Sequence, residues 1–318
     1  HYRGNAAVLG YEVFNEPTDF AQPGFNRQLQ CAYAGRRRAP SSCAGEHVQA
    51  LPTGLIGAIQ AADRTHVVLF EPMVTTFAGQ PETVGITEPL RFPGLALAFH
   101  VYGIPPPGML GCPGTVCLPS EQATVDALIA DRARTRTRQP GGPAIIMDEF
   151  GGGPNVPDIA QVADLARRAS LSWSYWSALQ LHDPTGAPDE TLLDQRTRRP
   201  WLAKAQVLGA PYPFATAGTP GTHTFDSLTA TFRFTYAVDR RVHAPSEIVV
   251  SPSDYPRGYT VAVQGAVVVS ARNAPVLKLI PLPAAASVTV AVAPVGANPH
   301  SSRLLSPDRR PHRPLEAR

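Results

Sequence analysis

The sequence contains no apolar run long enough to cross a bilayer, since a membrane-spanning helix needs about 20 consecutive apolar residues. It has no glycine-rich phosphate loop that would indicate a nucleotide site. It also lacks a basic stretch interleaved with aromatic residues, and a net charge of +3 gives weak support to a nucleic-acid partner. The positive excess is carried by arginine, which we interpret as a solvated surface. Contact with an anionic lipid headgroup or a membrane surface is the alternative, and we expect no nucleic-acid partner.

Cysteine is scarce, and its four occurrences fall into two local pairs, Cys31 with Cys43 and Cys112 with Cys117. Neither pair has C-x-x-C spacing, and no histidine lies at a zinc-like spacing from them. We therefore predict two loop disulfides in an exported protein. Four reduced, half-buried thiols are the alternative.

The chain begins with His1 rather than methionine, directly before a predicted strand, and it shows no signal peptide. This start is typical of a fragment, so we expect the complete protein to have further residues before His1, including any export signal. Together with the paired cysteines, it predicts a secreted or cell-surface location.

Prolines and glycines are abundant, with 34 and 26 occurrences, and they concentrate between apolar segments. Short apolar runs predict five buried strands, at 6–14, 66–71, 95–102, 144–149 and 172–179. The spacing of apolar residues predicts helices at 46–63, 120–138, 158–169 and 201–208. Alternating strands and helices imply parallel pairing with right-handed crossovers, and apolar strands fit a sheet that is covered on both faces.

Functional side chains stand at the carboxyl end of nearly every predicted strand, which is where catalytic residues lie in a (β/α)-barrel. These side chains are Glu16, Glu71, His100, Tyr102, Glu149 and Trp176. A doubly wound sheet also alternates strands and helices, but it does not require a functional group at so many strand ends. The pattern therefore favours a barrel.

The pattern changes after Pro211-Tyr212-Pro213, because residues 229–236 alternate polar and apolar side chains with a period of two. Further short strands are predicted at 247–250, 259–264, 266–270, 276–279 and 287–292. Such a series is typical of a β-sandwich. We predict an α/β barrel portion over 1–213, an all-β sandwich over 214–296 and a disordered tail over 297–318, which has few apolar residues.

Two glutamates, Glu16 and Glu149, follow apolar strands just before turn residues. Retaining glycoside hydrolysis uses such a pair, because one carboxyl group protonates the leaving oxygen while the other attacks the anomeric carbon. His100 and Tyr102 are two positions apart and therefore share a strand face. Asp148 is expected on the strand face opposite to Glu149, and we interpret it as structural.

These motifs resemble glycoside hydrolase family 5, of the cellulase superfamily, and within it the endoglycoceramidases. The resemblance to the family rests on Asn15-Glu16-Pro17, His100-x-Tyr102, Glu149-Phe150-Gly151 and Trp176. The resemblance to the branch rests on Glu71-Pro72, on His182-Asp183-Pro184-Thr185-Gly186, and on the junction made by Pro211-Tyr212-Pro213 and Ala217-Gly218-Thr219-Pro220.

The resemblance implies that Glu16 is the acid/base, that Glu149 is the nucleophile, and that no metal or organic cofactor takes part. Its other implied site residues bind or position the sugar: Asn15 at the 2-hydroxyl, His100 and Tyr102 around the nucleophile, Trp176 as a stacking floor, and Glu71 and Asp183 as further candidate contacts. Enzymes of this branch cleave the β-glycosidic bond between sugar and ceramide. The expected partner is therefore a glycolipid or oligosaccharide substrate, with peripheral contact to a membrane or micelle surface, for a monomeric protein.

In a family 5 barrel of eight strands the acid/base follows the fourth strand, whereas here it follows the first. The resemblance therefore implies a partial TIM (β/α)8 barrel that holds strands 4–8 only. Five strands cannot close such a barrel, so we expect the chain alone to be inactive on glycolipid. Alternative functions are a family 5 β-glucanase, a glycolipid or steryl β-glucosidase, or an inactive fragment that acts only as a carbohydrate- or lipid-binding module.

Overall fold

The structure, a computed structural model, describes residues 1–16, 50–71, 90, 92–102, 143–151, 155–179 and 190–296. The chain divides into two compact units, His1–Gly209 and Ala210–Arg318, and each is considered by itself. Several predictions concern residues outside the described part of the chain: the helix at 120–138, Cys31, Cys43, Cys112, Cys117, Asp183 and the tail at 297–318.

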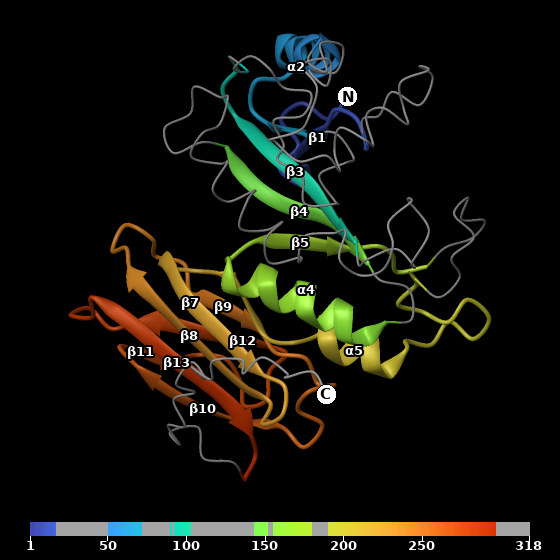
Figure 1. The fold of residues 1–318 in the computed structure, drawn as a ribbon. Coiled ribbons are helices and arrows are strands. Elements are labelled where there is room, and N and C mark those ends of the chain that lie inside the picture. Colours follow the sequence, from blue (N-terminus) through green and yellow to red (C-terminus); the bar gives the residue numbers. More distant parts are fainter. Residues whose placement is uncertain are drawn as a thin grey trace, which may run out of the picture. The chain divides into compact units, whose positions relative to one another are not determined.

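The N-terminal unit is built on a parallel sheet whose five strands lie side by side in chain order (Figure 1). The strands are β1 (Gly10–Glu12), β2 (Val67–Phe70), β3 (Leu95–Tyr102), β4 (Ala144–Gly151) and β5 (Ser172–Tyr175). A doubly wound sheet reverses its strand order at a switch point, whereas a barrel wall keeps the order of the chain. The predicted partial TIM barrel is thus confirmed.

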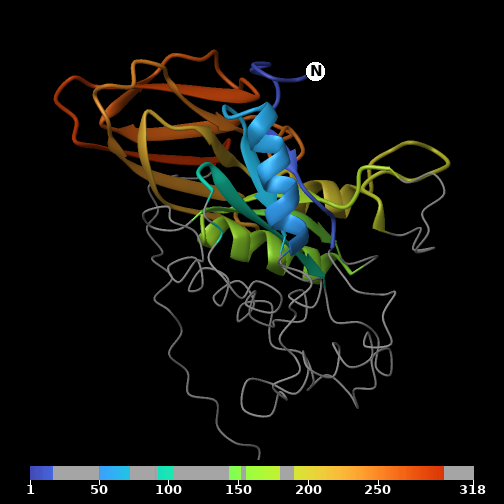
Figure 2. The ribbon, with the colours of Figure 1, turned by 90° about the horizontal axis from the view of Figure 1, so that it is seen from above.

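Helices cover one face of this sheet, and they are α2 (Ala50–Ala62), α4 (Val156–Arg168) and α5 (Leu202–Leu208). Helix α2 leads into β2 and packs against it (Figure 2). In α4 the buried residues Ile159, Val162, Ala163 and Ala166 recur at the spacing of one helix face. They share a core with Leu95, Leu97, Phe99 and Val101, which are alternate residues of β3. Among the described residues, no helix combines the length and apolarity needed to cross a membrane.

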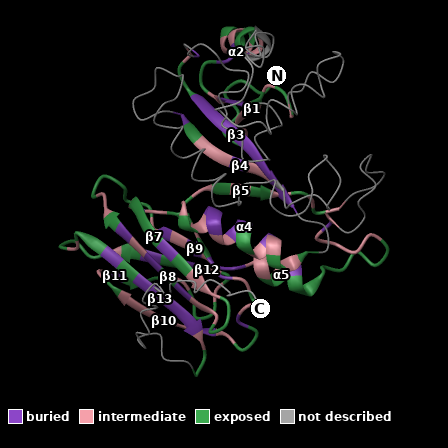
Figure 3. Ribbon diagram, in the orientation of Figure 1, coloured by how far each residue is buried: buried purple, intermediate pink, exposed green. Residues whose placement is uncertain are grey.

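The opposite face of the sheet, called the inner face below, carries a smaller core. Its buried members are Leu69, Ala96 and Ala98. Strand β3 is buried from Leu95 to Val101, as Figure 3 shows. Because side chains alternate along a strand, His100 follows Ala96 and Ala98 onto the inner face. An ionisable group is therefore held at the carboxyl end of an otherwise apolar strand.

Strand β4 interrupts the alternation, and this corrects one prediction. Its pairing with β3 shifts so that Met147 lies opposite Phe99 while Glu149 lies opposite His100, which leaves Asp148 as the extra residue of a bulge. Met147 packs in the helix-covered core, and the next residue of β4 to do so comes three positions later. The expectation that Asp148 faces away from Glu149 was wrong, because a period of two does not hold across a bulge.

The C-terminal unit contains two antiparallel sheets of four strands each. One has the order β10 (Tyr259–Gln264), β13 (Ser287–Pro294), β8 (Thr231–Val238) and β7 (Gly218–Asp226). The other has the order β11 (Ala266–Val268), β12 (Val276–Pro281), β9 (Ser246–Val249) and β6 (Tyr212–Ala215). One core draws buried side chains from both sheets, among them Phe234, Tyr236, Leu277 and Val290. This arrangement is the predicted β-sandwich.

Two of these strands, β6 and β7, do not appear among the predicted ones. They contain Pro213, Gly218, Pro220 and Gly221, which indicate breaks when the sequence is considered alone. Each lies at the edge of its sheet. An edge strand has one side without a partner strand, so it can accept a residue that lacks an N–H group.

Candidate active site

Five carboxyl groups surround the imidazole of His100 at the carboxyl ends of strands β1 to β4. They belong to Glu12, Glu16, Glu71, Asp148 and Glu149. One oxygen each from Glu16 and Glu149 and a ring nitrogen of His100 lie within 4.8 Å of one another. The same limit holds for a second group, formed by Glu12, Glu71, Asp148 and His100. Residues that are far apart in the sequence thus form one cluster on the inner face.

His100 connects the two groups through its two ring nitrogens. The side chain is only 5% exposed. Its Nδ1 lies 2.8 Å from Oε1 of Glu16. Its Nε2 lies 3.4 Å from Oε1 of Glu71, 3.7 Å from Oε2 of Glu149 and 3.9 Å from Oδ1 of Asp148. Both nitrogens therefore face carboxyl oxygens, which is the environment of a doubly protonated imidazolium.

The charge of His100 follows from this environment. Burial alone disfavours the imidazolium, but the hydrogen bonds to Glu16 and Glu71 and the charges of Glu71 and Glu149 outweigh it. Together they raise the pKa of His100 to about 10. At neutral pH the ring is therefore a cation, with both nitrogens acting as donors.

The backbone of Glu16 adopts an unusual conformation. Its φ of 44° lies in the left-handed region, which is uncommon for a residue with a side chain. Its backbone N–H donates to Oε2 of Glu71 over 3.0 Å. Residues held in such conformations by their surroundings often occur at active sites. The turn after β1 therefore aims the Glu16 carboxyl group at His100 and is itself held by a side-chain contact.

Within the cluster, the exposed Glu12 and the half-buried Asp148 form an acidic pair. Burial is the largest cause that raises the pKa of Glu12, and a hydrogen bond with Glu71 adds to it, so the pKa reaches about 7. Burial, followed by the charge of Glu12, also raises the pKa of Asp148 to about 7. The carboxyl groups of Glu12 and Asp148 thus retain protons near neutral pH. Sequence reasoning missed Glu12, although its place at the end of a strand, four residues before Glu16, was a usable signal.

The remaining predicted site residues are placed less completely. Asn15 is exposed beside Glu16. Trp176 is 40% exposed and follows β5, and its backbone N–H donates to the carbonyl oxygen of Phe150 over 2.8 Å. The peptide bond between Trp176 and Ser177 is cis. Tyr102 ends β3, and its side chain, like Asp183, lies outside the described part of the chain. Their sugar contacts stay predictions.

Glu71 is 4% exposed, and the contacts described for it are to protein groups. A direct substrate contact by Glu71 stays a prediction. Carboxylate oxygens at this spacing are also ligands that a divalent cation accepts. An imidazolium offers a cation no lone pair, so His100 would have to lose a proton before it could join such a site. The expectation that no metal takes part stays untested.

Comparison with known protein families covers both units. Residues 1–180 match the cellulase (glycosyl hydrolase family 5) model. Residues 211–292 match the glycoside hydrolase family 5 C-terminal domain. The first match includes every carboxyl group of the cluster, and the second covers the sandwich.

Individual relatives agree with this assignment. Endoglycoceramidase I of Rhodococcus hoagii (strain 103S) is 30% identical over 291 residues, which are 87% of this chain and 52% of that protein. Endoglycoceramidase II of Rhodococcus sp., solved as a lactosyl-enzyme intermediate, is 26% identical with a TM-score of 0.64 over 92% of this chain and 60% of its own. Sterylglucosidase 1 of Cryptococcus neoformans shares the fold, with 13% identity and a TM-score of 0.51 over 78% of this chain and 44% of its own.

The chain thus spans about half the length of the curated relative and about three fifths of the solved endoglycoceramidase. The family model covers more than half of this chain, and its matched range contains the parallel sheet and the cluster around His100. The chain therefore belongs to glycoside hydrolase family 5 and is similar to the endoglycoceramidases within it.

Proposed function

We propose that this chain carries the catalytic pair of a retaining β-glycosidase that hydrolyses the O-glycosyl bond between sugar and ceramide in glycosphingolipids. The observation that supports it is the meeting of Glu16 and Glu149, whose oxygens lie within 4.8 Å of each other beside His100. Retaining enzymes hold the two carboxyl groups about 5–5.5 Å apart, whereas inverting enzymes leave about 6.5–9.5 Å for a water molecule. The observed spacing favours retention.

In this mechanism Glu149 attacks the anomeric carbon while Glu16 gives its proton to the leaving ceramide oxygen. Water then displaces Glu149, and Glu16 accepts the proton of that water, so the configuration at the anomeric carbon is retained. His100 donates to Glu16 from Nδ1 and so orients the Glu16 carboxyl group for both steps. Trp176 offers an exposed ring on which a sugar can stack. Asn15, Tyr102 and Asp183 complete the proposed sugar contacts.

The relatives support the choice of substrate. Endoglycoceramidase II of Rhodococcus sp. is described in a lactosyl-enzyme intermediate and in a complex with ganglioside GM3. A covalent glycosyl-enzyme belongs to the retaining route. We extend the sugar–ceramide bond to this chain on the basis of its similarity to that protein and of its own pair of glutamates.

The substrate class is tested by incubating the chain with fluorescent glycosylceramide, cellotetraose and a fluorescent steryl glucoside. The five-stranded sheet alone is expected to be inactive, so the assay is repeated with a co-expressed segment that supplies the other strands of the barrel, called the completed barrel below. We expect the completed barrel to release the glycosylceramide sugar. Preferred cleavage of cellotetraose would instead indicate a β-glucanase, and preferred cleavage of the steryl substrate a steryl β-glucosidase. Turnover of none of the three by the completed barrel would leave the non-catalytic binding module as the function of this chain.

The roles of the two glutamates are tested by substitution. In the completed barrel, Glu149→Gln is expected to reduce turnover to background, since the nucleophile is lost. Glu16→Ala should still be glycosylated by a dinitrophenyl glycoside, whose leaving group needs no protonation, and azide should then accept the sugar with retained configuration. Glu247→Gln, on strand β9 of the sandwich, is the control and should behave as the unaltered chain. An inverted azide product from Glu149→Gln, with no rescue of Glu16→Ala, would support Glu149 as the nucleophile and weaken the role of Glu16, whereas a retained product from Glu149→Gln would reverse the assignment.

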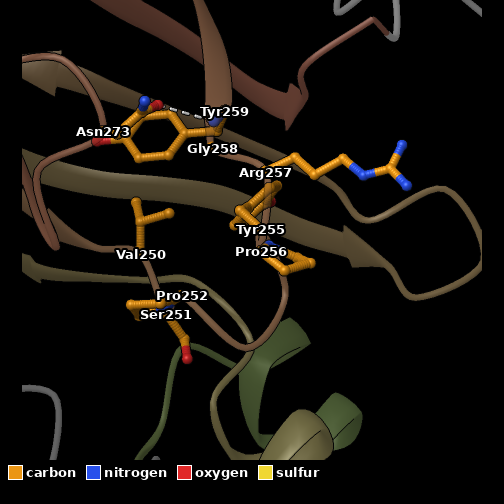
Figure 4. A pocket seen from close by; sticks show the side chains of 9 residues that line it. All are labelled: Val250, Ser251, Pro252, Tyr255, Pro256, Arg257, Gly258, Tyr259 and Asn273. Carbon is orange, nitrogen blue, oxygen red and sulfur yellow. Dashed lines mark hydrogen bonds between the residues drawn. The ribbon is translucent and has the colours of Figure 1, made fainter.

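We also propose that one end of the sandwich contacts the lipid surface in which a glycolipid substrate lies. A cavity of about 370 Å³ at this end is lined by Tyr255, Tyr259 and Asn273, and Arg257 points away from it (Figure 4). The Tyr255 hydroxyl donates to the carbonyl oxygen of Ala230, which places the cavity beside the turn between β7 and β8.

An apolar side chain marks the tip of that turn, because Leu228 is 97% exposed. Asp226 accepts hydrogen bonds from the backbone N–H groups of the turn, while Arg257 and Arg272 are exposed near the cavity. An exposed aliphatic tip with nearby arginines is suited to an anionic lipid–water interface.

Sedimentation with phosphatidylserine vesicles tests this contact. Leu228→Asp should weaken binding, whereas Leu282→Asp, at an exposed site beyond the other end of β10, should not. Equal binding by both variants would argue against a lipid contact at this end.

Export, the two disulfides and the monomeric state belong to the same proposal. An oxidising compartment would allow Cys31–Cys43 and Cys112–Cys117 to form. Mass spectrometry of non-reduced peptides from exported protein should show these two links, and four free thiols would contradict them. All the groups of the cluster come from one chain, so a monomer is sufficient, and gel filtration coupled to light scattering measures it.

A further inference from the structure

Glu71 is the most deeply buried carboxyl group of the cluster. It contacts the backbone of Glu16 and also the imidazole of His100, which bonds the Glu16 side chain. It directly follows strand β2, so a short, rigid segment carries it onto the inner face. Its Oε2 accepts the backbone N–H of Glu16 at 3.0 Å. Its Oε1 lies 3.4 Å from Nε2 of His100, whose Nδ1 bonds the Glu16 carboxyl group.

The first contact acts on the backbone. Glu16 has a left-handed φ of 44°, a conformation that normally costs about 1–2 kcal/mol for a residue with a side chain. The hydrogen bond to Glu71 satisfies the N–H that this turn presents inward. A charged acceptor makes a stronger bond than a neutral one, so Glu71 offsets part of that cost.

The second contact acts on the imidazole. Around the ring, Glu16 faces Nδ1, and Glu71, Glu149 and Asp148 face Nε2. Glu71 is the nearest of the three to Nε2 and the most buried, so its charge is the least screened by solvent. Besides this ion pair, Glu71 shares a hydrogen bond with the carboxyl group of Glu12, one oxygen of which also lies within 4.8 Å of a ring nitrogen of His100.

We propose that Glu71 is a positioning residue that fixes the geometry of the Glu16–Glu149 pair. It holds the Glu16 turn with one carboxylate oxygen and the His100 imidazolium with the other. This inference rests on the proposed glycosidase function and goes beyond it. Glu71 touches neither the reacting bond nor the sugar in this role. It acts through Glu16 and His100.

A test follows from the chemistry of the two acceptors. Glutamine has nearly the same volume as glutamate, but one of its two oxygens is replaced by an NH₂ group that can only donate. Whichever way the amide turns, its NH₂ group faces another donor, which is either the Glu16 N–H or the His100 Nε2–H. Glu71→Gln should therefore preserve packing while breaking one of the two contacts. Glu71→Asp keeps two acceptors and the charge, and it should lie between Gln and the unaltered residue.

The first readout is the titration of His100, followed by NMR of protein with ¹³C-labelled histidine, its signal assigned from a His100→Gln sample. In Glu71→Gln the pKa of His100 should fall by at least one unit, a tenfold loss in proton affinity. Asp63→Asn is the matched control, because Asp63 is a buried carboxylate that lies 2.6 Å from His66 at the other end of β2. It should leave the His100 titration unchanged.

The second readout is steady-state hydrolysis of glycosylceramide by the completed barrel. Because a displacement of about 1 Å in a reacting group can cost on the order of 100-fold, Glu71→Gln should lower kcat about 10- to 100-fold with little change in KM. An unchanged kcat together with an unchanged His100 titration would overturn the inference. A raised KM with an unchanged kcat would also overturn it and would make Glu71 a substrate contact.

The outcomes separate the two proposals. If even the completed barrel hydrolyses no glycoside, the proposed function fails for this chain, and the His100 titration alone decides on Glu71. If Glu71→Gln does not fold, the unaltered chain still decides, because a His100 that titrates near the ordinary 6.5 would exclude the ion pair.

Discussion

At the scale of single residues, His100 determines how the carboxyl groups of the site divide their charge. Five carboxyl groups cannot all ionise beside one imidazole without strong mutual repulsion. The cluster avoids this by keeping His100 charged and by retaining protons on Glu12 and Asp148, whose pKa values reach about 7. The proposed nucleophile and acid/base are thus spared some of that repulsion.

The stability of the N-terminal unit should therefore fall as pH rises from about 5 to 9. The pKa values of Glu12, Asp148 and His100 are all raised on folding. The folded state then binds more protons than the unfolded state across this range, so deprotonation favours unfolding. The two carboxyl groups lose their contribution as pH passes about 7, and His100 loses its own toward about 10. Scanning calorimetry at pH 5, 7 and 9 should show a falling transition temperature.

The sandwich provides an internal control for this prediction. Among its described groups with shifted pKa values, Asp239 is lowered to about 2, while Tyr236, Tyr255 and Tyr259 are raised above their usual value of 10. None of these four groups titrates between pH 5 and 9, so the transition temperature of the sandwich should stay nearly constant over this range. A transition of the N-terminal unit that stays constant or rises over this range would contradict the assigned charges.

The sequence is informative about a single residue when a motif marks it, and less so when only its neighbours in space define it. Glu16, His100 and Glu149 each stand at a strand end, and the structure brings them together. The contacts of Glu71 depend on which oxygen meets which donor, and no local pattern encodes that. Asp148 was placed on the wrong face because the bulge in β4 has no signature in the apolar run that contains it.

At the scale of elements, strands with an apolar or alternating run were predictable, and the two strands that carry proline and glycine were not. Strands β3 and β10 have the predicted bounds, because apolar or alternating runs mark them clearly. The edge strands β6 and β7 contain proline and glycine, so their backbone pairing is invisible to a pattern of side chains. Pairing with β8 and β9 outweighs the weak strand propensity of these residues.

Gly265 shows how one residue can connect two elements. It joins β10 to β11, which belong to different sheets of the sandwich. Its φ is 79°, and a Cβ added there would lie 2.2 Å from the carbonyl oxygen of Ser287. Gly265→Ala should destabilise the sandwich by more than about 1–2 kcal/mol, because the left-handed conformation alone costs that much. Calorimetry of the sandwich transition measures the loss.

Gly296 is the matched control for this substitution. Its φ is 91°, but a Cβ added there would meet no atom within 4 Å. Gly296→Ala therefore isolates the conformational cost, and the difference between the two variants gives the cost of the backbone clash. Equal effects would mean that the corner between the sheets relaxes to accept a methyl group.

At the scale of the whole molecule, the chain combines two units with separate cores. The larger core of the N-terminal unit forms between the parallel sheet and its helices, whereas the sandwich core forms between two antiparallel sheets. Among the described residues, none belongs to both of these cores. The sequence already indicated this division through the change from continuous apolar runs to alternating strands.

A cavity in one core should therefore lower the stability of that unit alone. Phe99 and Phe234 are both fully buried, one in each core. Replacing a buried phenylalanine by alanine typically costs about 3–5 kcal/mol, because packing is lost and a cavity remains. Phe99→Ala should lower the calorimetric transition of the N-terminal unit, and Phe234→Ala that of the sandwich. Phe214→Ala, at an exposed position of β6, should change either transition by less than about 0.5 kcal/mol. If Phe99→Ala and Phe234→Ala each displaced both transitions equally, the units would unfold together, and separate cores would not imply separate stability.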